Sequence, residues 1–271
     1  MERLRSLYFF LAVIGLVAPS NEVRAVEPVD VVLVLAVDVS RSMSDSELDI
    51  QREGYASAIS HPDVIAAIKQ GAYGRIAVAM FEWAADFRKS DVFGWTLVEN
   101  SADADELAQI ILGTPAIGQN RTSISGAIRR GIELIESSPY EGFRKVIDVS
   151  GDGPNNQGEL VLAARSAALA KKITINGLPL MTFGDPGFGL YMEDLDLYYR
   201  DCVTGGPGSF IVPVTSWDQF SEAVRRKLVQ EIGGLEQALP PILKAQTGGK
   251  IADCEIGEKI WHQRQWMFDG N

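Results

Sequence analysis

The chain of 271 residues has few of the side chains that bind soft metals or act as strong nucleophiles. Its only histidines are His61 and His262, and its only cysteines are Cys202 and Cys254. The two histidines are isolated from each other, so a zinc site is unsupported. Neither cysteine has a histidine neighbour in the sequence, so a cysteine nucleophile activated by histidine is unsupported as well.

Positive charge is also scarce. The chain has 25 Lys and Arg against 36 Asp and Glu, which gives a formal net charge of −11. Nucleic-acid binding requires clustered basic residues, and no such cluster interleaved with aromatic residues is present. We therefore expect no nucleic-acid partner, and the acidic balance favours solubility.

Long apolar runs are absent after the first residues. The apolar block at 7–17 follows a basic start, and small residues precede Ala25, which is typical of a secretory signal peptide over residues 1–25. The alternative is an uncleaved anchor helix, but the block is shorter than the ~20 residues that a membrane span needs. No cysteine near Ala25 could accept a lipid. We expect no stable membrane anchor after cleavage, and a mature protein in the periplasm or outside the cell.

The rest of the chain has the composition of one globular domain, with 46% hydrophobic and 23% charged residues. We expect this domain to span residues 26–234. Beyond it the periodic pattern weakens, and Pro240-Pro241 interrupts it. Residues 235–271 are therefore expected to form a C-terminal extension.

Strand-like apolar runs alternate with helical patterns along most of this domain. Parallel strands need helical crossovers, so this alternation predicts a doubly wound, Rossmann-like α/β fold with helices on both faces of a mostly parallel, six-stranded sheet. The predicted strands are residues 31–37, 75–81, 92–98, 145–149, 173–180 and 209–214, and the predicted helices are residues 44–59, 64–69, 104–112, 123–136, 158–172 and 217–232.

Oxygen-bearing side chains follow the first strand at alternate positions, as Asp38, Ser40 and Ser42. Hard divalent cations such as Mg2+ take oxygen ligands, and one carboxylate with two short hydroxyls suits them. Asp and Ser are also ordinary turn and helix-cap residues after a strand. These positions alone therefore leave capping open as the alternative.

Two later loops support the metal site. Thr122 lies in a polar loop directly before a helical pattern, and Asp152 follows a second apolar strand, between two glycines. Ligands of doubly wound folds bind beyond the carboxyl ends of the strands, and all of these loops lie at that edge. The expected metal ligands are therefore Asp38, Ser40, Ser42, Thr122 and Asp152.

This set resembles the metal-ion-dependent adhesion site (MIDAS) of von Willebrand factor A domains, in which Asp-x-Ser-x-Ser, a Thr and an Asp-Gly come from three loops. The resemblance covers residues 29–233 and implies the A-type fold. The segments 148–156 and 198–203 resemble those of exported bacterial proteins of this superfamily whose specific function is undefined. Asn155, Asn156 and the C-terminal extension depart from the adhesion domains, which leaves the partner open.

The resemblance implies an exported module that binds a protein partner through a divalent metal. Mg2+, or Mn2+ or Ca2+, would be held by the five residues, and an Asp or Glu of the partner would complete its coordination. One alternative is a hydrolase that uses the cation as Lewis acid, with Glu82, Asp148 or a carboxylate of residues 193–196 as general base. No complete catalytic constellation is present, so we expect no enzyme. A metal-free structural module is the third reading.

The two cysteines are expected to form a disulfide, because an exported chain meets oxidising surroundings. A Cys202–Cys254 bond would tie the extension back to the domain, and two unpaired buried thiols are the alternative. Trp261, Trp266 and Phe268 of the extension are then expected to cap the core rather than to form a partner surface.

Overall fold

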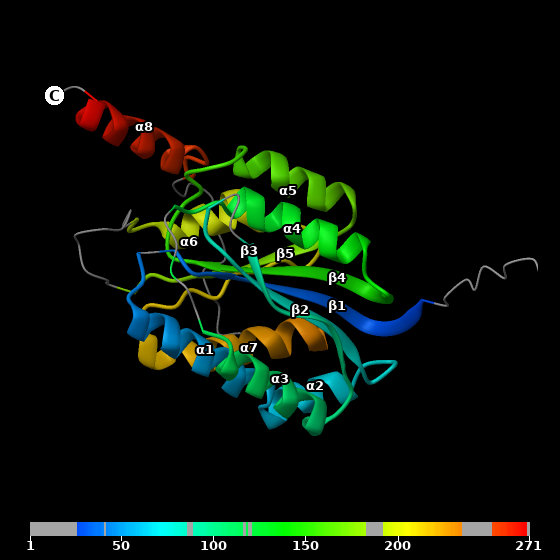
Figure 1. The fold of residues 1–271 in the computed structure, drawn as a ribbon. Coiled ribbons are helices and arrows are strands. Elements are labelled where there is room, and N and C mark those ends of the chain that lie inside the picture. Colours follow the sequence, from blue (N-terminus) through cyan, green and yellow to red (C-terminus); the bar gives the residue numbers. More distant parts are fainter. Residues whose placement is uncertain are drawn as a thin grey trace, which may run out of the picture.

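The computed structural model describes residues 26–40, 42–85, 89–115, 118, 121–182, 192–234 and 251–269. Within them, five strands form one sheet in the order β3-β2-β1-β4-β5 (Figure 1). Only β3 is antiparallel to its neighbour, so the sheet is mostly parallel, as predicted. The predicted signal peptide lies outside the described residues. The strands are β1 (Glu27–Asp38), β2 (Ile76–Trp83), β3 (Lys89–Val98), β4 (Tyr140–Gly151) and β5 (Thr174–Pro179).

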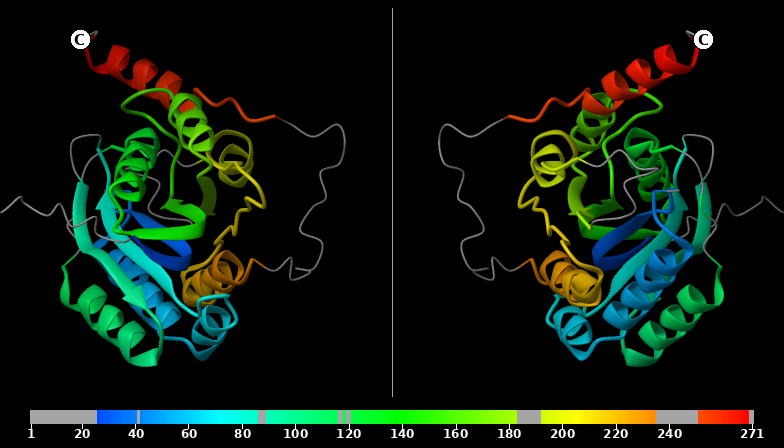
Figure 2. Two further views of the ribbon diagram at one scale, coloured as in Figure 1. Left: turned by 90° about the vertical axis from the view of Figure 1, so that its right-hand side faces the viewer. Right: turned by 90° about the vertical axis from the view of Figure 1, so that its left-hand side faces the viewer.

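Helices cover both faces of the sheet (Figures 1 and 2). On one face lie α1 (Asp45–Ile59), α2 (Pro62–Lys69), α3 (Ser101–Gly113) and α7 (Phe220–Gly233). On the other lie α4 (Ile124–Glu136), α5 (Val161–Ala170) and the short α6 (Leu195–Tyr198), which continues as a π-helical turn (Tyr199–Val203). The doubly wound α/β class predicted from the sequence is therefore the observed one.

The central strand β1 explains why its sequence shows no polar alternation. Residues Val31 to Val37 are all at most 1% exposed, because each face of the strand is covered by helices. Odd-numbered side chains pack with α1, α2, α3 and α7, and even-numbered side chains pack with α4 and α5. The sheet thus separates two apolar layers, and its polar residues collect at the strand ends.

The predicted sixth strand is wrong. Residues 209–214 pair with β5 only through isolated bridges at Ile211 and Val214. Val212 and Val214 donate to the carbonyls of Gly177 and Pro179, but Pro179 of β5 has no backbone N–H to donate in return, which interrupts the ladder. Gly206 and Gly208 adopt positive φ angles in the preceding turn. An apolar run therefore covers the sheet edge here without becoming a regular strand.

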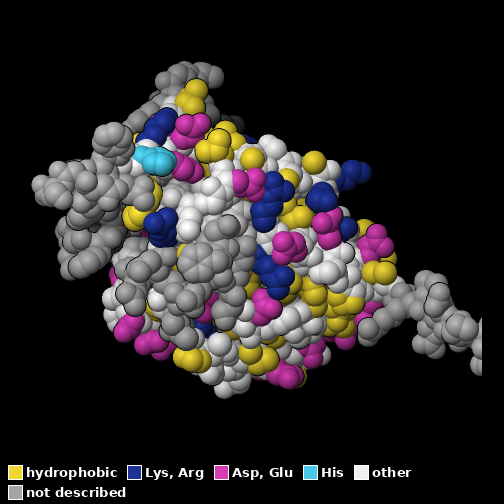
Figure 3. All heavy atoms as spheres, turned by 45° about the horizontal axis from the view of Figure 1, so that its top comes forward, with side chains coloured by type: hydrophobic (Ala, Val, Ile, Leu, Met, Phe, Trp, Pro, Cys, Tyr) yellow, Lys and Arg dark blue, Asp and Glu magenta, His cyan; other side chains and the backbone are white. Residues whose placement is uncertain are grey.

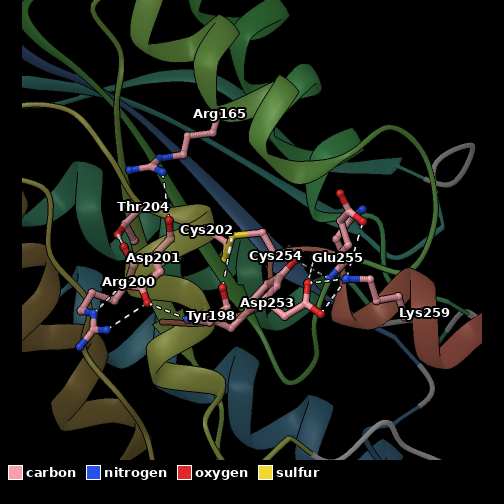
Figure 4. The surroundings of a disulfide bond; sticks show 12 residues. Arg165, Tyr198, Arg200, Asp201, Cys202, Thr204, Asp253, Cys254, Glu255 and Lys259 are labelled. Atoms are coloured by element: carbon pink, nitrogen blue, oxygen red, sulfur yellow. Dashed lines mark hydrogen bonds and ion pairs between the residues drawn. A yellow bond between two sulfur atoms is a disulfide. The ribbon is translucent and has the colours of Figure 1, made fainter. Parts of the chain in front are cut away.

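The expected disulfide is present. Cys202, in the π-helical turn, is bonded to Cys254, just before helix α8 (Ile256–Asp269) (Figure 4). This excludes the alternative of two free thiols. Trp261 is half-buried on α8, while the side chains of Trp266 and Phe268 lie outside the described ones. The extension is thus linked covalently to the domain at the turn that follows α6.

A charged cluster lies within the apolar layer under α7. The ammonium group of Lys227 lies 2.5 Å from Asp148 Oδ1 of β4 and is paired with Glu231 one helical turn along α7, and all three side chains are buried. Asn176 of β5 donates to Glu231 at 2.9 Å. Burial, together with the nearby charge of Asp148, raises the pKa of Glu231 to about 7. Asp148 is therefore occupied by a core ion pair, although its sequence position made it a candidate general base.

We predict that Lys227→Met lowers the free energy of unfolding by about 3–5 kcal/mol, because it leaves two buried carboxyl groups without their cation. Urea unfolding of the disulfide-intact protein measures the change. Arg225→Gln on the same helix is the matched control, since Arg225 pairs with exposed carboxylates and its loss should change stability by less than about 1 kcal/mol. Equal effects of the two substitutions would contradict the structural role of Lys227.

Candidate metal site

The first loop of the site begins at the last residue of β1. Asp38 is fully buried, and its Oδ1 accepts a hydrogen bond from the backbone N–H of Ser40 at 2.7 Å. Gln51 of α1 donates to the backbone carbonyl of Asp38 at 2.9 Å. Strand, loop and helix therefore hold the Asp38 carboxylate in one orientation.

The third loop brings its carboxylate to the hydroxyls of the first. Ser42 Oγ donates to Asp152 Oδ1 at 2.8 Å, and Ser40 Oγ lies 3.4 Å from the same oxygen. The two serine hydroxyls are 3.0 Å apart. Residues separated by about 110 positions along the chain thus form one cluster of oxygen atoms.

Thr122 of the second loop lies next to this cluster. Its side chain is buried, and its Oγ1 lies 3.9 Å from the position that a Cβ on Gly153 would take. The Thr122 N–H donates to Asn156 Oδ1 at 3.0 Å, and the Asn156 N–H donates back to the Thr122 carbonyl at 2.9 Å. All five predicted residues therefore lie at the carboxyl edge of the sheet, and the structure brings them together.

Asparagines connect the second and third loops, which the sequence did not reveal. Besides the Asn156 pair, Asn155 is fully buried and accepts the backbone N–H of Ser125 through its Oδ1 at 2.9 Å. Their adjacency to Asp152 was visible in the sequence, but only as a departure from adhesion domains. Their contacts lie with residues about 30 positions away, so local spacing carried no signal for this role.

The two carboxylates lack a counter-charge. In the described part of the chain, neither Asp38 nor Asp152 is ion-paired with Lys or Arg, and Asp38 Oδ2 has no hydrogen-bond partner. Burial raises the pKa of Asp38 well above its usual range, and the charge of Asp152 raises it further. Burial also raises the pKa of Asp152 to about 6, against the hydrogen bonds from Ser42 and Ser40. A divalent cation would relieve both effects.

The donor set fits a hard cation. It consists of two carboxylates and short hydroxyls, all oxygen, and includes a buried carboxylate oxygen without a partner. The described residues contain no group of three or more His, Cys, Asp and Glu side chains arranged to hold a metal. Metal binding at this edge would therefore depend on the serine and threonine hydroxyls as well as on the charges.

Gly151 leaves room for aromatic side chains next to the Asp38 carboxylate. A Cβ at this position would lie 2.8 Å from Asp38 Oδ2 and 2.7 Å from the hydroxyl of Tyr199. That hydroxyl is buried without a hydrogen-bond partner, as is the indole N–H of Trp83. Burial raises the pKa of Tyr199 well above its usual range, and the charge of Asp38 adds to this. Sequence reasoning missed both aromatic residues, because nothing in their local pattern distinguishes them from core residues.

The remaining carboxylates considered as general bases lie at the end of β2 and at the start of α6. Glu82 at the end of β2 is buried and paired with Arg52 of α1, which also donates to the carbonyl of Ile111 at 2.9 Å. Burial raises the pKa of Glu82 to about 6, against the attraction of Arg52. Asp194 is the N-cap residue of α6 and Asp196 lies in its first turn. Glu82 is therefore occupied by an ion pair, and the two aspartates lie at the start of α6.

The C-terminal extension contacts two of the site loops. A Cβ on Gly257 of α8 would lie 2.0 Å from the carbonyl oxygen of Asn155, so only glycine allows this approach. Glu258 accepts a hydrogen bond from Asn155 Nδ2 at 2.7 Å. The guanidinium carbon of Arg121, one residue before Thr122, lies 4.4 Å from the centroid of the Trp261 ring. Helix α8 therefore packs beside the candidate metal site.

Comparison with known proteins places the chain by family and by fold. A family model described as "Protein of unknown function (DUF1194)" matches residues 28–236. No curated protein matches the chain by sequence.

Solved structures share the fold at low identity. Proximal thread matrix protein 1 (PTMP1) from the mussel byssus has 10% identity and a TM-score of 0.56 over 76% of this chain and 49% of its own. The pilus adhesin SpaC from Lactobacillus rhamnosus GG has 13% identity and a TM-score of 0.56 over 77% and 31%. The vWF domain of the type V pili tip protein Mfa5 from Porphyromonas gingivalis has 13% identity and a TM-score of 0.51 over 75% and 95%.

A further structure of PTMP1 contains a zinc-occupied MIDAS motif, with 15% identity and a TM-score of 0.52 over 76% of this chain and 47% of that one. The present chain spans about half the length of PTMP1 and about a third of SpaC. These similarities show that it has the fold of von Willebrand factor A domains. The fold expected from the five-residue motif is confirmed.

We predict that Asp152→Asn stabilises the metal-free protein at neutral pH. The raised pKa means that the folded protein binds the Asp152 proton more tightly than the unfolded chain does. The stability from this group is therefore fully present below its ordinary pKa and is lost as the pH rises through about 6. At pH 7.5 with chelator, the variant should be more stable than the wild type by roughly 1–3 kcal/mol, and at pH 4 the difference should vanish.

Urea unfolding at both pH values measures this effect, with Asp105→Asn on the exposed face of α3 as the control. A metal-free Asp152→Asn protein that is less stable than the wild type at pH 7.5 would show that the carboxylate is not destabilised by its burial.

Proposed function

The chain belongs to the DUF1194 family and has the von Willebrand factor A fold, and from this basis we propose that it is an exported, divalent-metal-dependent protein-binding module. One observation carries the proposal. The buried carboxylate of Asp38 and the half-buried carboxylate of Asp152 lie with the hydroxyls of Ser40, Ser42 and Thr122 at one sheet edge, without a basic partner in the described part of the chain.

The proposed metal is Mg2+, with Mn2+ or Ca2+ as further candidates, because all donors are hard oxygen atoms. The zinc-occupied MIDAS motif of PTMP1 supports a divalent ion at the corresponding edge of this fold. The cation would supply positive charge to a site that otherwise repels anions. Asp38 and Asp152 would carry the charge of the ligand set, and the hydroxyls would complete it on the protein side.

The proposed partner is a protein that presents an Asp or Glu to the metal. The hydroxyl ligands are neutral, and a divalent cation commonly keeps coordination positions for water or for an oxygen of a partner, so a further carboxylate can bind to it. PTMP1, SpaC and the Mfa5 domain are a matrix protein, a pilus adhesin and a pilus tip protein. Proteins with this fold therefore include several that work outside the cell, which supports the proposed export.

Binding is favoured over hydrolysis by the positions of the other carboxylates. Glu82 is paired with Arg52, and Asp148 with Lys227, so neither is free to take a proton at the metal edge. A hydrolase would need a base within hydrogen-bond reach of the attacking water. We therefore propose that the cation bridges two proteins and does not activate water.

Export is proposed from the leader-like residues 1–25 and agrees with the disulfide between Cys202 and Cys254. Among the helices that the structure describes, none has the length and apolar character to cross a membrane. Both the periplasm and the extracellular space fit these observations.

Metal titration of the mature, metal-stripped protein tests the proposal. We expect saturable binding of Mg2+ or Mn2+ by calorimetry in the wild type, and loss of this binding in Asp38→Ala and Asp152→Ala, because each substitution removes half of the ligand charge. Asp105→Ala on α3 is the control and should bind like the wild type. Undiminished binding in Asp38→Ala would show that the metal lies elsewhere and would refute the proposed site.

A further inference from the structure

Arg121 lies on the rim of the candidate metal site. It directly precedes Thr122, is exposed to solvent, and adopts the left-handed conformation with φ of 72°. Among the described residues only Arg121 and Lys172 combine a side chain with positive φ. Such a conformation is strained by about 1 kcal/mol or more and persists only where the surroundings impose it. The loop therefore presents Arg121 in an imposed direction.

The guanidinium group of Arg121 has no carboxylate partner in the described part of the chain. Three arginines of helices α4 and α7 do, since Arg129 pairs with Glu159, Arg130 with Asp91, and Arg225 with Asp63 and Glu222. On the face shown in Figure 3, basic and acidic side chains are accordingly interspersed. In a chain of net charge −11, an uncompensated arginine beside two carboxylate-bearing loops is a distinct feature.

Helix α8 contacts this arginine through the ring of Trp261. The guanidinium carbon lies 4.4 Å from the ring centroid of Trp261, in cation–π geometry. The ring positions the guanidinium without neutralising its charge, and the N–H groups, which have no carboxylate partner in the described part of the chain, can bind a carboxylate in bidentate fashion. The disulfide, the Asn155–Glu258 hydrogen bond and the close approach at Gly257 place Trp261 there.

We propose that Arg121 and Trp261 form a second anchor for the protein partner, and that the partner segment is extended and acidic, with two carboxylates. One carboxylate completes the coordination of the metal, and the other is bound by the edge of the Arg121 guanidinium. Helix α8 is thereby part of the binding face. The inference rests on the proposed function, because it takes the metal site as the first anchor.

The spacing of the two carboxylates follows from chain geometry. Arg121 is the immediate neighbour of Thr122, so the two anchors are separated by about the reach of one arginine side chain. An extended segment advances by about 3.3–3.6 Å per residue. Two acidic residues separated by two to four positions can therefore reach both anchors.

Peptides of matched length test this inference on the mature, disulfide-intact protein at saturating Mg2+. One peptide carries a single Asp, and the others carry a second Asp two, three or four positions away. We expect at least one two-carboxylate peptide to bind the wild type roughly 5- to 20-fold more tightly than the single-Asp peptide. Arg121→Gln should abolish this preference, and leave the affinity for metal and for the single-Asp peptide unchanged.

Two further variants separate recognition from packing. Trp261→Leu keeps the cation but removes its platform, and should reduce the preference without abolishing it. Arg130→Gln, which replaces a half-buried arginine of α4 that is paired with Asp91, is the control and should keep the preference in full. If Arg121→Gln weakens both peptides equally, Arg121 only packs α8 against the domain and the second anchor is refuted.

The same experiment distinguishes failure of this inference from failure of the proposed function. Metal-dependent binding of the single-Asp peptide, with no gain from a second carboxylate, overturns the second anchor alone. Absence of metal-dependent binding for every peptide, in protein that binds Mg2+, overturns the carboxylate bridge and the second anchor together.

Discussion

The candidate site depends on two like charges held close together at one edge of the sheet, one of them fully buried. Asp38 is the last residue of β1, and Asp152 directly follows β4. These two strands are hydrogen-bonded neighbours, so the register of the sheet itself holds the carboxylates together. Their repulsion is offset by the backbone N–H groups of Ser40 and Asp152 and by the hydroxyls of Ser40 and Ser42. The apolar layers, the helix starts and the asparagine links keep this unfavourable arrangement in place, which is the energetic basis of the proposed cation binding.

The sequence predicted some features of the fold and of the candidate site, and missed others. Five strands were found because a strand covered on both faces reads as a continuous apolar run, as Val31 to Val37 does. The sixth failed because the apolar composition of residues 209–214 does not report that Pro179, in the neighbouring strand, lacks the N–H that a regular ladder needs. The five ligand candidates were found because their spacing within each loop is local. The Glu82–Arg52 pair and the approach of Tyr199 to Asp38 join distant segments, and only the folded chain shows them.

The C-terminal extension has more than a covalent link to the domain. Helix α8 reaches the third loop through Asn155 and the second loop through Arg121, while the disulfide attaches it near α6. The two asparagines that depart from adhesion domains are therefore part of the same arrangement: Asn156 joins the loops to each other, and Asn155 joins them to α8. The rim of the metal site and the extension are one structural unit.

The buried Lys227 cluster limits how α7 can move. Asp148 and Asn176 belong to strands of the sheet, whereas Lys227 and Glu231 belong to α7. A slide by a fraction of a turn would carry the ammonium group away from Asp148 into apolar surroundings, which is strongly unfavourable. Equivalent side-chain positions recur only about every 5.4 Å along a helix. A shift by one turn would bring Ala223 or Glu231 to the place of Lys227 opposite Asp148, so helix α7 has a single favourable position along the sheet.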